Sequence, residues 1–145
     1  MDAIQILKDF HRELSGLFEL ILITENPGEK QSIFQKVKEE LDLYSLIEQH
    51  TLYPALSDGN ELVKLIDRSY DEHDDMSDRA EEINQMENAT QEFDSAVQDL
   101  ADVFDRHVEN EECDLFPKVA TLLNGDDLIL LGNEINELRG LGMAA

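Results

Sequence analysis

The chain has few of the residues that cross-link or interrupt a fold: one cysteine, no tryptophan, three prolines and seven glycines among 145 residues. The single cysteine, Cys113, excludes an internal disulfide and fits a reducing compartment. No apolar run is long enough to cross a bilayer, and the N-terminus is amphipathic and acidic rather than an apolar signal core. We therefore expect a cytoplasmic protein that folds as a single domain over residues 1–145.

Basic residues are also scarce, because 11 lysines and arginines accompany 34 aspartates and glutamates, for a formal net charge of −23. No basic stripe is present to neutralise phosphates, so the composition argues against binding to nucleic acid or to an anionic membrane. The simplest interpretation of the charge is a solvated acidic surface on helices. A small neutral ligand, such as a peroxide or a diatomic molecule, would feel little of this charge.

The prolines and glycines separate segments whose apolar residues repeat every three or four positions, which is typical of amphipathic helices. Breaks are expected at Asn26-Pro27-Gly28, at Ser57-Asp58-Gly59-Asn60 and at Asn88-Ala89-Thr90. Four segments of roughly 25–30 residues predict an all-α fold, an up-down-up-down four-helix bundle over residues 2–123. The third helix is expected to turn Tyr70, His73 and Ser77 inward.

A short fifth helix is predicted over residues 126–139, after the break at Asn124-Gly125. We expect Asp126 to cap it, as Asp2 should cap the first helix. This helix should cover one end of the bundle or contact a second subunit, and residues 140–145 should fray.

Two stretches that lie 63 residues apart match without a gap: YSLIEQHTLYPAL, residues 44–56, and HVENEECDLFPKV, residues 107–119. The match pairs Glu48 with Glu111 and places Tyr44 opposite His107. Within each copy the two residues are spaced i, i+4, Tyr44 with Glu48 and His107 with Glu111, so both members of a pair lie on the same face of their helix.

Histidines complete this repeat on the other two helices, since His11 and His73 are 62 residues apart on apolar faces. Two helical hairpins related by a pseudo-twofold axis would bring one ligand set from each to a shared centre. That arrangement is the geometry of a two-metal site inside a four-helix bundle.

Buried carboxylates supply the energetic argument, because an unpaired glutamate in an apolar core costs several kcal/mol. No lysine or arginine shares these faces, so a cation is the natural partner of Glu48 and Glu111. Carboxylate and imidazole donors favour iron or manganese, whereas structural zinc would favour four ligands, commonly with cysteine. Taken singly, each histidine is more typical of a hydrogen-bonded core residue and Tyr44 of a core aromatic; the combination favours metal binding.

The pattern resembles the hemerythrin-like, or HHE cation-binding, domain family, whose second and fourth helices carry ligand-xxx-Glu-Glu-xxx-Tyr/Phe-Pro and His-xxx-Glu-Glu-xxx-Phe-Pro segments. The resemblance covers nearly the whole chain and implies two non-haem irons in an oxo- or hydroxo-bridged centre. Six metal ligands are implied: His11, Tyr44, Glu48, His73, His107 and Glu111. Glu48 and Glu111 would bridge the irons. His11 and Tyr44 would serve one iron, and His73 and His107 the other.

Three positions depart from the family pattern. Tyr44 stands in place of a histidine, Gln49 stands in place of a glutamate, and Ser69 and Ser77 stand where oxygen carriers have a second histidine on the third helix. The set lies nearer the family's bacterial branch, which includes iron–sulfur-cluster repair proteins. A phenolate from Tyr44 would favour Fe(III) and lower the reduction potential; the alternative is that Tyr44 only hydrogen-bonds a bound water.

The neighbouring polar residues are expected to lie outside the ligand set. Helical spacing turns His50 and Cys113 away from the metal face, with His50 kept open as a replacement ligand through a helix distortion. Glu72 and Asp74 should face solvent, although one of them could orient a ligand imidazole.

Fewer protein ligands leave coordination positions open for peroxide or dioxygen. We therefore expect a monomer or weak homodimer with a catalase-like or oxidative-stress role on these small ligands. The alternative is a non-enzymatic module that binds, stores or senses iron or oxygen, and the fold does not decide between them. A metal-free bundle is disfavoured because its carboxylates would be buried without counter-charge.

Overall fold

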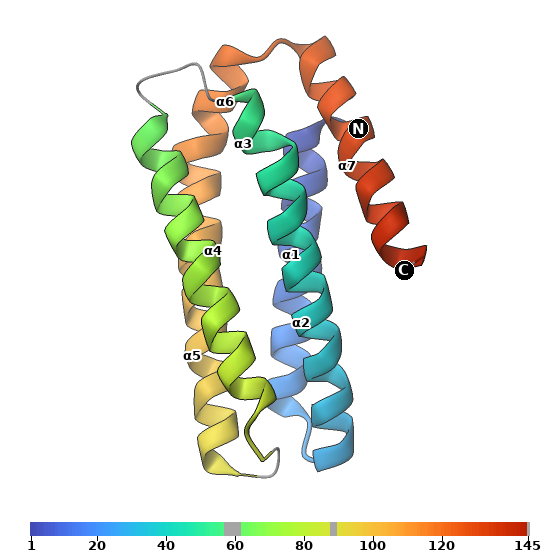
Figure 1. Cartoon of the computed structure of the whole chain (residues 1–145), viewed down its shortest axis with the longest axis vertical. Helices are drawn as coiled ribbons and strands as arrows, with labels where there is room; N and C mark the ends of the chain where they lie inside the picture. The colour runs from blue at the N-terminus through green and yellow to red at the C-terminus, as the bar shows by residue number, and fades with distance from the viewer. Residues whose placement is uncertain (57–61, 88–89, 145) are drawn as a thin grey trace.

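The computed structural model describes residues 1–56, 62–87 and 90–144, and within these ranges the regular structure is helical. Four long helices, α1 (Ala3–Ile23), α2 (Pro27–His50), α4 (Val63–Asn84) and α5 (Gln91–Asn110), form the up-down-up-down bundle that the sequence predicts (Figure 1). The predicted breaks at 57–60 and 88–89 lie outside the described residues. The other elements are α3 (Leu52–Ala55), the π-helix η1 (Glu111–Leu115), α6 (Phe116–Leu122) and a last helix, α7 (Gly125–Ala144).

Helix starts are set by short polar side chains that accept a hydrogen bond from a backbone N–H of the first turn. Three of the long helices begin this way, with Asp2 on α1, Asn26 on α2 and Thr90 on α5. The predicted cap of the fifth helix is wrong. Asn124 Oδ1 accepts from Asp127 N (2.8 Å), and Asp127 Oδ2 accepts from Asn124 N (3.3 Å). This reciprocal pair starts α7 at Gly125, so Asp126 already lies inside the first turn.

Both copies of the sequence repeat leave regular α-helical geometry close to their glutamate, two residues after Glu48 and at Glu111 itself. α2 ends at His50 and restarts as α3, whereas α5 passes directly into the π-helical turn η1. Pro54 and Pro117 occupy matching positions and explain the coincidence, because a proline cannot donate to the carbonyl four residues earlier. Ala55 and Leu122 lie beyond these interruptions and are exposed, so the inward faces of the preceding helices do not extend to them.

The inner face of α4 differs from the prediction at two positions. Ser69 and Met76 are buried, whereas Tyr70 and Ser77 are exposed. The buried positions step alternately by three and four residues, so the inward residue that follows Ile66 is Ser69 and not Tyr70.

The last helix packs along α1 and α2 rather than across one end of the bundle, as Figure 1 shows on the right. It also continues to Ala144, past the predicted end at 139, with Ala145 outside the described residues. Leu138 packs against the core and the Arg139 guanidinium lies 4.4 Å from the centre of the Phe10 ring, which holds the later turns in place. In the described part of the chain, no helix is long and apolar enough to cross a membrane.

Gly132 is where α7 approaches α1 most tightly. A Cβ built there would lie 2.7 Å from the Met1 carbonyl oxygen and 3.2 Å from Ala3 N. We expect Gly132→Ala to lower the free energy of unfolding by about 1–3 kcal/mol, because backbone atoms must move. Gly16→Ala is the control: nothing lies within 4 Å of its Cβ, and the change should stabilise α1 by about 0.5–1 kcal/mol. Urea unfolding of both variants tests the pair, and equal effects would contradict the close contact.

Candidate metal centre

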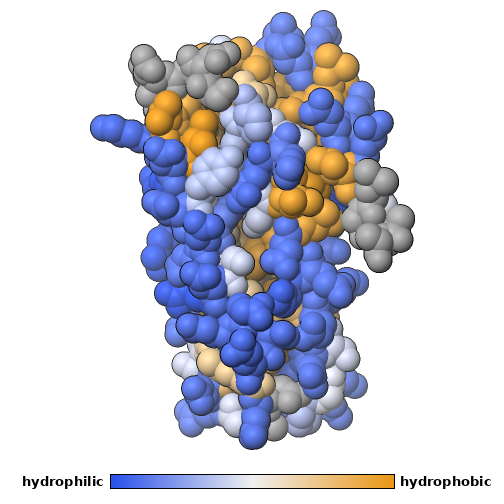
Figure 2. Space-filling model, viewed as in Figure 1, coloured by the Kyte–Doolittle hydropathy of each residue, from blue (hydrophilic) through white to orange (hydrophobic). Residues whose placement is uncertain are grey.

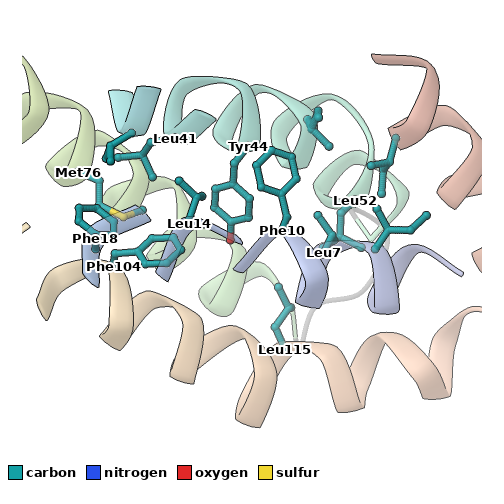
Figure 3. Packing of buried hydrophobic residues seen from close by; sticks show 14 of the residues in the cluster. Leu7, Phe10, Leu14, Phe18, Leu41, Tyr44, Leu52, Met76, Phe104 and Leu115 are labelled. Atoms are coloured by element: carbon teal, nitrogen blue, oxygen red, sulfur yellow. The ribbon is translucent and has the colours of Figure 1, made fainter. Parts of the chain in front are cut away.

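The centre of the bundle is polar although its surroundings are apolar. Tyr44 projects from α2 between Phe10 and Leu14 of α1, with its hydroxyl turned into the bundle (Figure 3). All six predicted ligands are at most 2% exposed, and they come from α1, α2, α4, α5 and η1: His11, Tyr44, Glu48, His73, His107 and Glu111. Six buried polar side chains at one level of a bundle need partners or a cation.

One half of this centre gathers around Tyr44. Its hydroxyl donates to Glu111 Oε1 (2.5 Å) and lies 2.8 Å from His11 Nε2 and 2.9 Å from His107 Nε2. His11 Nε2 is also 3.1 Å from Glu111 Oε1. A phenol, an imidazole and a carboxylate therefore point their donor atoms at one small volume.

The other half gathers around Glu48. Its Oε1 lies 2.9 Å from His73 Nε2 and 3.5 Å from His107 Nε2. Ligating atoms of Glu48, His73 and His107 all lie within 4.8 Å of one another, and so do those of His11, Glu48 and Glu111. Glu48 is thus common to two groups that could each hold a metal ion.

Each histidine is oriented from behind through its Nδ1 atom. His73 Nδ1 lies 2.9 Å from Gln49 Nε2, and His11 Nδ1 lies 2.8 Å from Glu112 Oε2. Gln49 and Glu112 directly follow the two glutamates of the repeat, so they are equivalent residues serving equivalent histidines. Sequence reasoning missed both roles, although the alignment of the repeat held the signal. Outer partners of this kind fix the ring orientation of metal-binding imidazoles.

The third histidine has a carboxylate partner. Glu72 Oε1 lies 2.9 Å from His107 Nδ1, and the second oxygen of Glu72 accepts from Asn110 Nδ2 (2.7 Å). The sequence predicted that Glu72 and Asp74 face solvent, with the alternative that one of them orients an imidazole. The alternative holds for Glu72, and its histidine lies on the neighbouring helix. Asp74 is exposed.

Tyr53 is a second buried phenol in the centre, which the sequence analysis had treated only as part of the repeat. Its hydroxyl lies 3.0 Å from Glu48 Oε1 and 2.9 Å from Glu111 Oε2, close enough to donate to either carboxylate. The same oxygen lies 3.2 Å from His73 Nε2 and makes a side-chain hydrogen bond with Ser69. The corresponding residue of the second copy is Phe116, which stacks on His11. The first copy of the repeat therefore has a hydroxyl group at this position, and the second copy has none.

His50 and Cys113 are exposed, as their helical spacing predicts. His50 lies on a hollow between α3 and α7 instead of in the centre. The helix interruption after His50 therefore does not bring it in as a replacement ligand.

In the metal-free centre the charged groups form a pair, His107 on α5 and Glu111 on η1. Burial alone would lower the pKa of His107, but the charge and hydrogen bond of Glu111 leave it well above its ordinary value. Burial would raise the pKa of Glu111, but the charge and hydrogen bond of His107 hold it well below its usual range. Burial and then the charge of Glu111 raise the pKa of Tyr44 well above its usual value, so Tyr44 is a neutral phenol here.

We expect metal binding at neutral pH to release protons, because an ion needs the lone pairs that protons occupy on His107 and Tyr44. The raised pKa of His107 gives the metal-free fold stability that is complete below 6.5 and is lost as the pH rises through the folded-state pKa. The depressed pKa of Glu111 gives stability that is present above 4.5 and is lost on acidification. The metal-free fold should therefore be most stable between these values, whereas metal affinity should rise with pH.

An anaerobic Fe(II) titration in weakly buffered solution with a pH indicator measures the release. Tyr44→Phe is the matched variant, since it removes one releasable proton and leaves His107 in place. Binding without any acidification would contradict this protonation scheme.

One buried oxygen atom indicates whether the centre fits a cation. Glu48 Oε2 is buried and has no hydrogen-bond partner among the described residues. Such an orphaned carboxylate oxygen is costly in a protein interior unless a positive charge lies against it. Together with the convergent imidazoles and carboxylates, it fits a metal ion.

Comparison with known proteins shows the family and the fold of the chain. Residues 2–119 match the family described as "Hemerythrin HHE cation binding domain". A hemerythrin HHE cation binding domain-containing protein from Mycobacterium kansasii, the Rv2633c homolog, has the same fold: its crystal structure superposes with a TM-score of 0.83 at 24% identity, over 97% of this chain and 88% of that one. A protein named DNA nickase from Nostoc sp. is 26% identical over 132 residues, which are 87% of this chain but 36% of that protein. The present chain thus spans about a third of that relative's length.

Proposed function

We propose, because the chain belongs to the hemerythrin HHE cation binding domain family, that its central side chains hold two iron ions and that the protein acts on peroxide or dioxygen. The observation that carries the proposal is Glu48, a fully buried carboxylate shared by two groups of possible ligands and left with one unpartnered oxygen. Two ions are supported because the two groups share Glu48 but otherwise consist of different residues, so that each group could hold an ion of its own.

The contacts support a division of the ligands between two ions. His11 and Tyr44 lie against each other at one end, and His73 lies beside His107 at the other, with ring centroids 4.9 Å apart. Glu48 and Glu111 lie between the two ends and would bridge them. Bound iron would supply the redox chemistry for peroxide or dioxygen.

The chain's own residues would prepare the centre for that chemistry. Tyr44 would bind as a phenolate, whose hard anionic oxygen favours the ferric state. Gln49, Glu112 and Glu72 hold the imidazole rings in position. Tyr53 keeps a phenolic proton beside both carboxylates, where it can be moved by a short distance.

A route for a small ligand is present between α2 and α4. A hollow of about 240 Å³ reaches inward from the surface to Gln49 and His73, and Ser45 and Ser77 form part of its wall. Asp42 and Asp74 also line it, so an anion would be repelled while a neutral peroxide or dioxygen would not.

The test is peroxide consumption by the iron-loaded protein, followed with an oxygen electrode, together with metal analysis. We expect oxygen release well above that of the same iron free in solution, and about two irons per chain. Two irons per chain without peroxide consumption would favour the alternative, a module that binds, stores or senses iron or oxygen. One ion per chain, or zinc from an iron-replete preparation, would contradict the two-iron centre.

DNA cleavage, the activity in the name of the Nostoc relative, is not carried over to this chain. The chain matches about a third of that protein, and its charge of −23 offers no basic stripe for a phosphate backbone. Cytoplasmic location and a monomer or weak homodimer remain predictions of the sequence, which gel filtration and cell fractionation test.

A further inference from the structure

The three tyrosines of this chain form one line from the centre to the surface. Tyr44 and Tyr53 are buried with their hydroxyls on the carboxylates, and the Tyr70 ring lies 5.2 Å from the Tyr53 ring, centroid to centroid. Tyr70 is 37% exposed. The six phenylalanines of the chain have no hydroxyl and are not easily oxidised, and the chain has no tryptophan. The easily oxidised aromatic rings of the chain are thus confined to this line.

Tyr53 has the surroundings that a buried redox-active phenol requires. When a phenol loses an electron it also loses its proton, and a proton without an acceptor would leave a buried positive charge. Two carboxylate oxygens lie within hydrogen-bond distance, Glu48 Oε1 at 3.0 Å and Glu111 Oε2 at 2.9 Å. The proton can move to either oxygen and return, so the Tyr53 side chain itself stays neutral when it is oxidised and reduced.

Tyr70 forms the outer end of the line beside a surface hollow of about 240 Å³. The hollow has apolar walls from Pro54, Val63 and Ile66, with the Tyr53 ring at its inner side and one carboxylate, Asp67. Figure 2 shows hydrophobic side chains gathered at this end of the bundle in a mostly hydrophilic surface. A single aromatic ring fits such walls, and Asp67 together with the charge of −23 disfavours an anion.

We propose that Tyr53 and Tyr70 carry single electrons from a neutral phenolic reductant in this hollow to the metal centre, which gives the protein a peroxidase activity. The inference rests on the proposed function. Each phenol gives up one electron and its hydroxyl proton, so that two phenols and one hydrogen peroxide yield two phenoxyl radicals and two waters. The O–O bond of peroxide breaks, and its two oxygens take up the two electrons and two protons.

Within the chain, each turnover passes through the same two side chains. Tyr70 first reduces Tyr53. Tyr70 then takes an electron and a proton from the phenol, which restores the Tyr70 hydroxyl. Tyr53 regains the proton that it had placed on Glu48 or Glu111. Exposure of Tyr70 lets its own proton exchange with solvent.

The first experiment needs no peroxide. Ferric-loaded protein is mixed anaerobically with hydroquinone, and loss of its visible absorption is followed by stopped flow. We expect Tyr70→Phe, which keeps the ring but loses the oxidisable hydroxyl, to slow reduction by about tenfold or more. Tyr70→Trp should restore the rate, because indole is also oxidisable. Ascorbate, an anion, should reduce the wild type more slowly than hydroquinone and should not distinguish the variants.

The second experiment adds peroxide and looks for the radical. Freeze-quenched samples of iron-loaded protein in a Cys113→Ser background should show a tyrosyl signal by electron paramagnetic resonance, and Tyr70→Phe should change it. Equal hydroquinone rates in wild type and Tyr70→Phe at equal iron content would overturn the electron route. If the route is present but the wild type consumes no peroxide, the electron-transfer line stands and the proposed peroxide function fails.

Discussion

Glu111→Ala should abolish stable metal binding, with a fall in affinity of more than about 100-fold. Glu111 is fully buried, and its Oε1 lies within 3.3 Å of the donor atoms of His11, Tyr44 and His107. Removing it takes away a proposed bridge and leaves two cations with one carboxylate between them. Metal analysis after desalting should show the iron content fall from about two per chain to below one.

Two further variants make that result interpretable. In the metal-free fold, loss of Glu111 breaks a buried ion pair with His107, which costs about 3–5 kcal/mol, so the variant could fail by unfolding. Glu111→Gln keeps the size and one carbonyl acceptor but removes the charge, and it should also lose iron while remaining helical. Glu109→Ala is the matched control, because that glutamate is exposed on the preceding turn. Full iron content in Glu111→Gln would overturn the bridging assignment.

Tyr44→Phe should abolish the visible charge-transfer band of the oxidised, iron-loaded protein while the bundle stays folded. The physical reason is that the phenolate-to-Fe(III) charge-transfer band requires a phenolate bound to the metal, and the metal-free Tyr44 is held neutral by burial and by Glu111. Loss of the hydroxyl leaves Glu111 without one donor, a cost of about 1–3 kcal/mol before metal is added. Visible absorption and resonance Raman spectra of the loaded protein provide the measurement.

The other two tyrosines are the controls for this band. Tyr70 is half-exposed and far out on the line, so Tyr70→Phe should leave the band unchanged. Tyr53→Phe discriminates more sharply, because Tyr53 is also buried on the carboxylates. A band that survives in Tyr44→Phe but disappears in Tyr53→Phe would transfer the ligand assignment to Tyr53. A band unaffected by either change would make both of them core aromatics.

Periodicity predicted the bundle because amphipathic stripes and proline–glycine breaks act locally. It was less reliable where two residues competed for one inward position, as Ser69 and Tyr70 do on α4. Hydrophobicity favours turning tyrosine inward, but the small serine leaves room for Tyr53, and the Tyr70 ring packs on Tyr53 from outside. That outcome depends on a contact between helices, which a single helical stripe does not contain.

The same distinction separates the parts of the centre. Four of the six buried side chains could be named from the repeat, because i, i+4 spacing places the two members of each pair on one face whatever the neighbouring helix does. His11 and His73 could be named because they lie 62 residues apart on apolar faces. The residues that hydrogen-bond these side chains are harder to predict, because they lie on other helices. Glu72 of α4, for example, contacts His107 of α5. Glu112 likewise serves His11 on α1, and Gln49 serves His73 on α4.

The difference between the two hairpins at Tyr44 and His107 has an evolutionary consequence. Behind His107 stands Glu72, which binds its Nδ1, whereas the equivalent position behind Tyr44 is Phe10, with ring centroids 5.5 Å apart. A tyrosine codon becomes a histidine codon by one base change, but a phenylalanine codon becomes a glutamate codon only when every base changes. An imidazole at position 44 opposite Phe10 would bury an N–H without an acceptor. Among descendants of this chain, histidine at 44 should therefore appear only together with a hydrogen-bond acceptor at 10, so that the two positions covary.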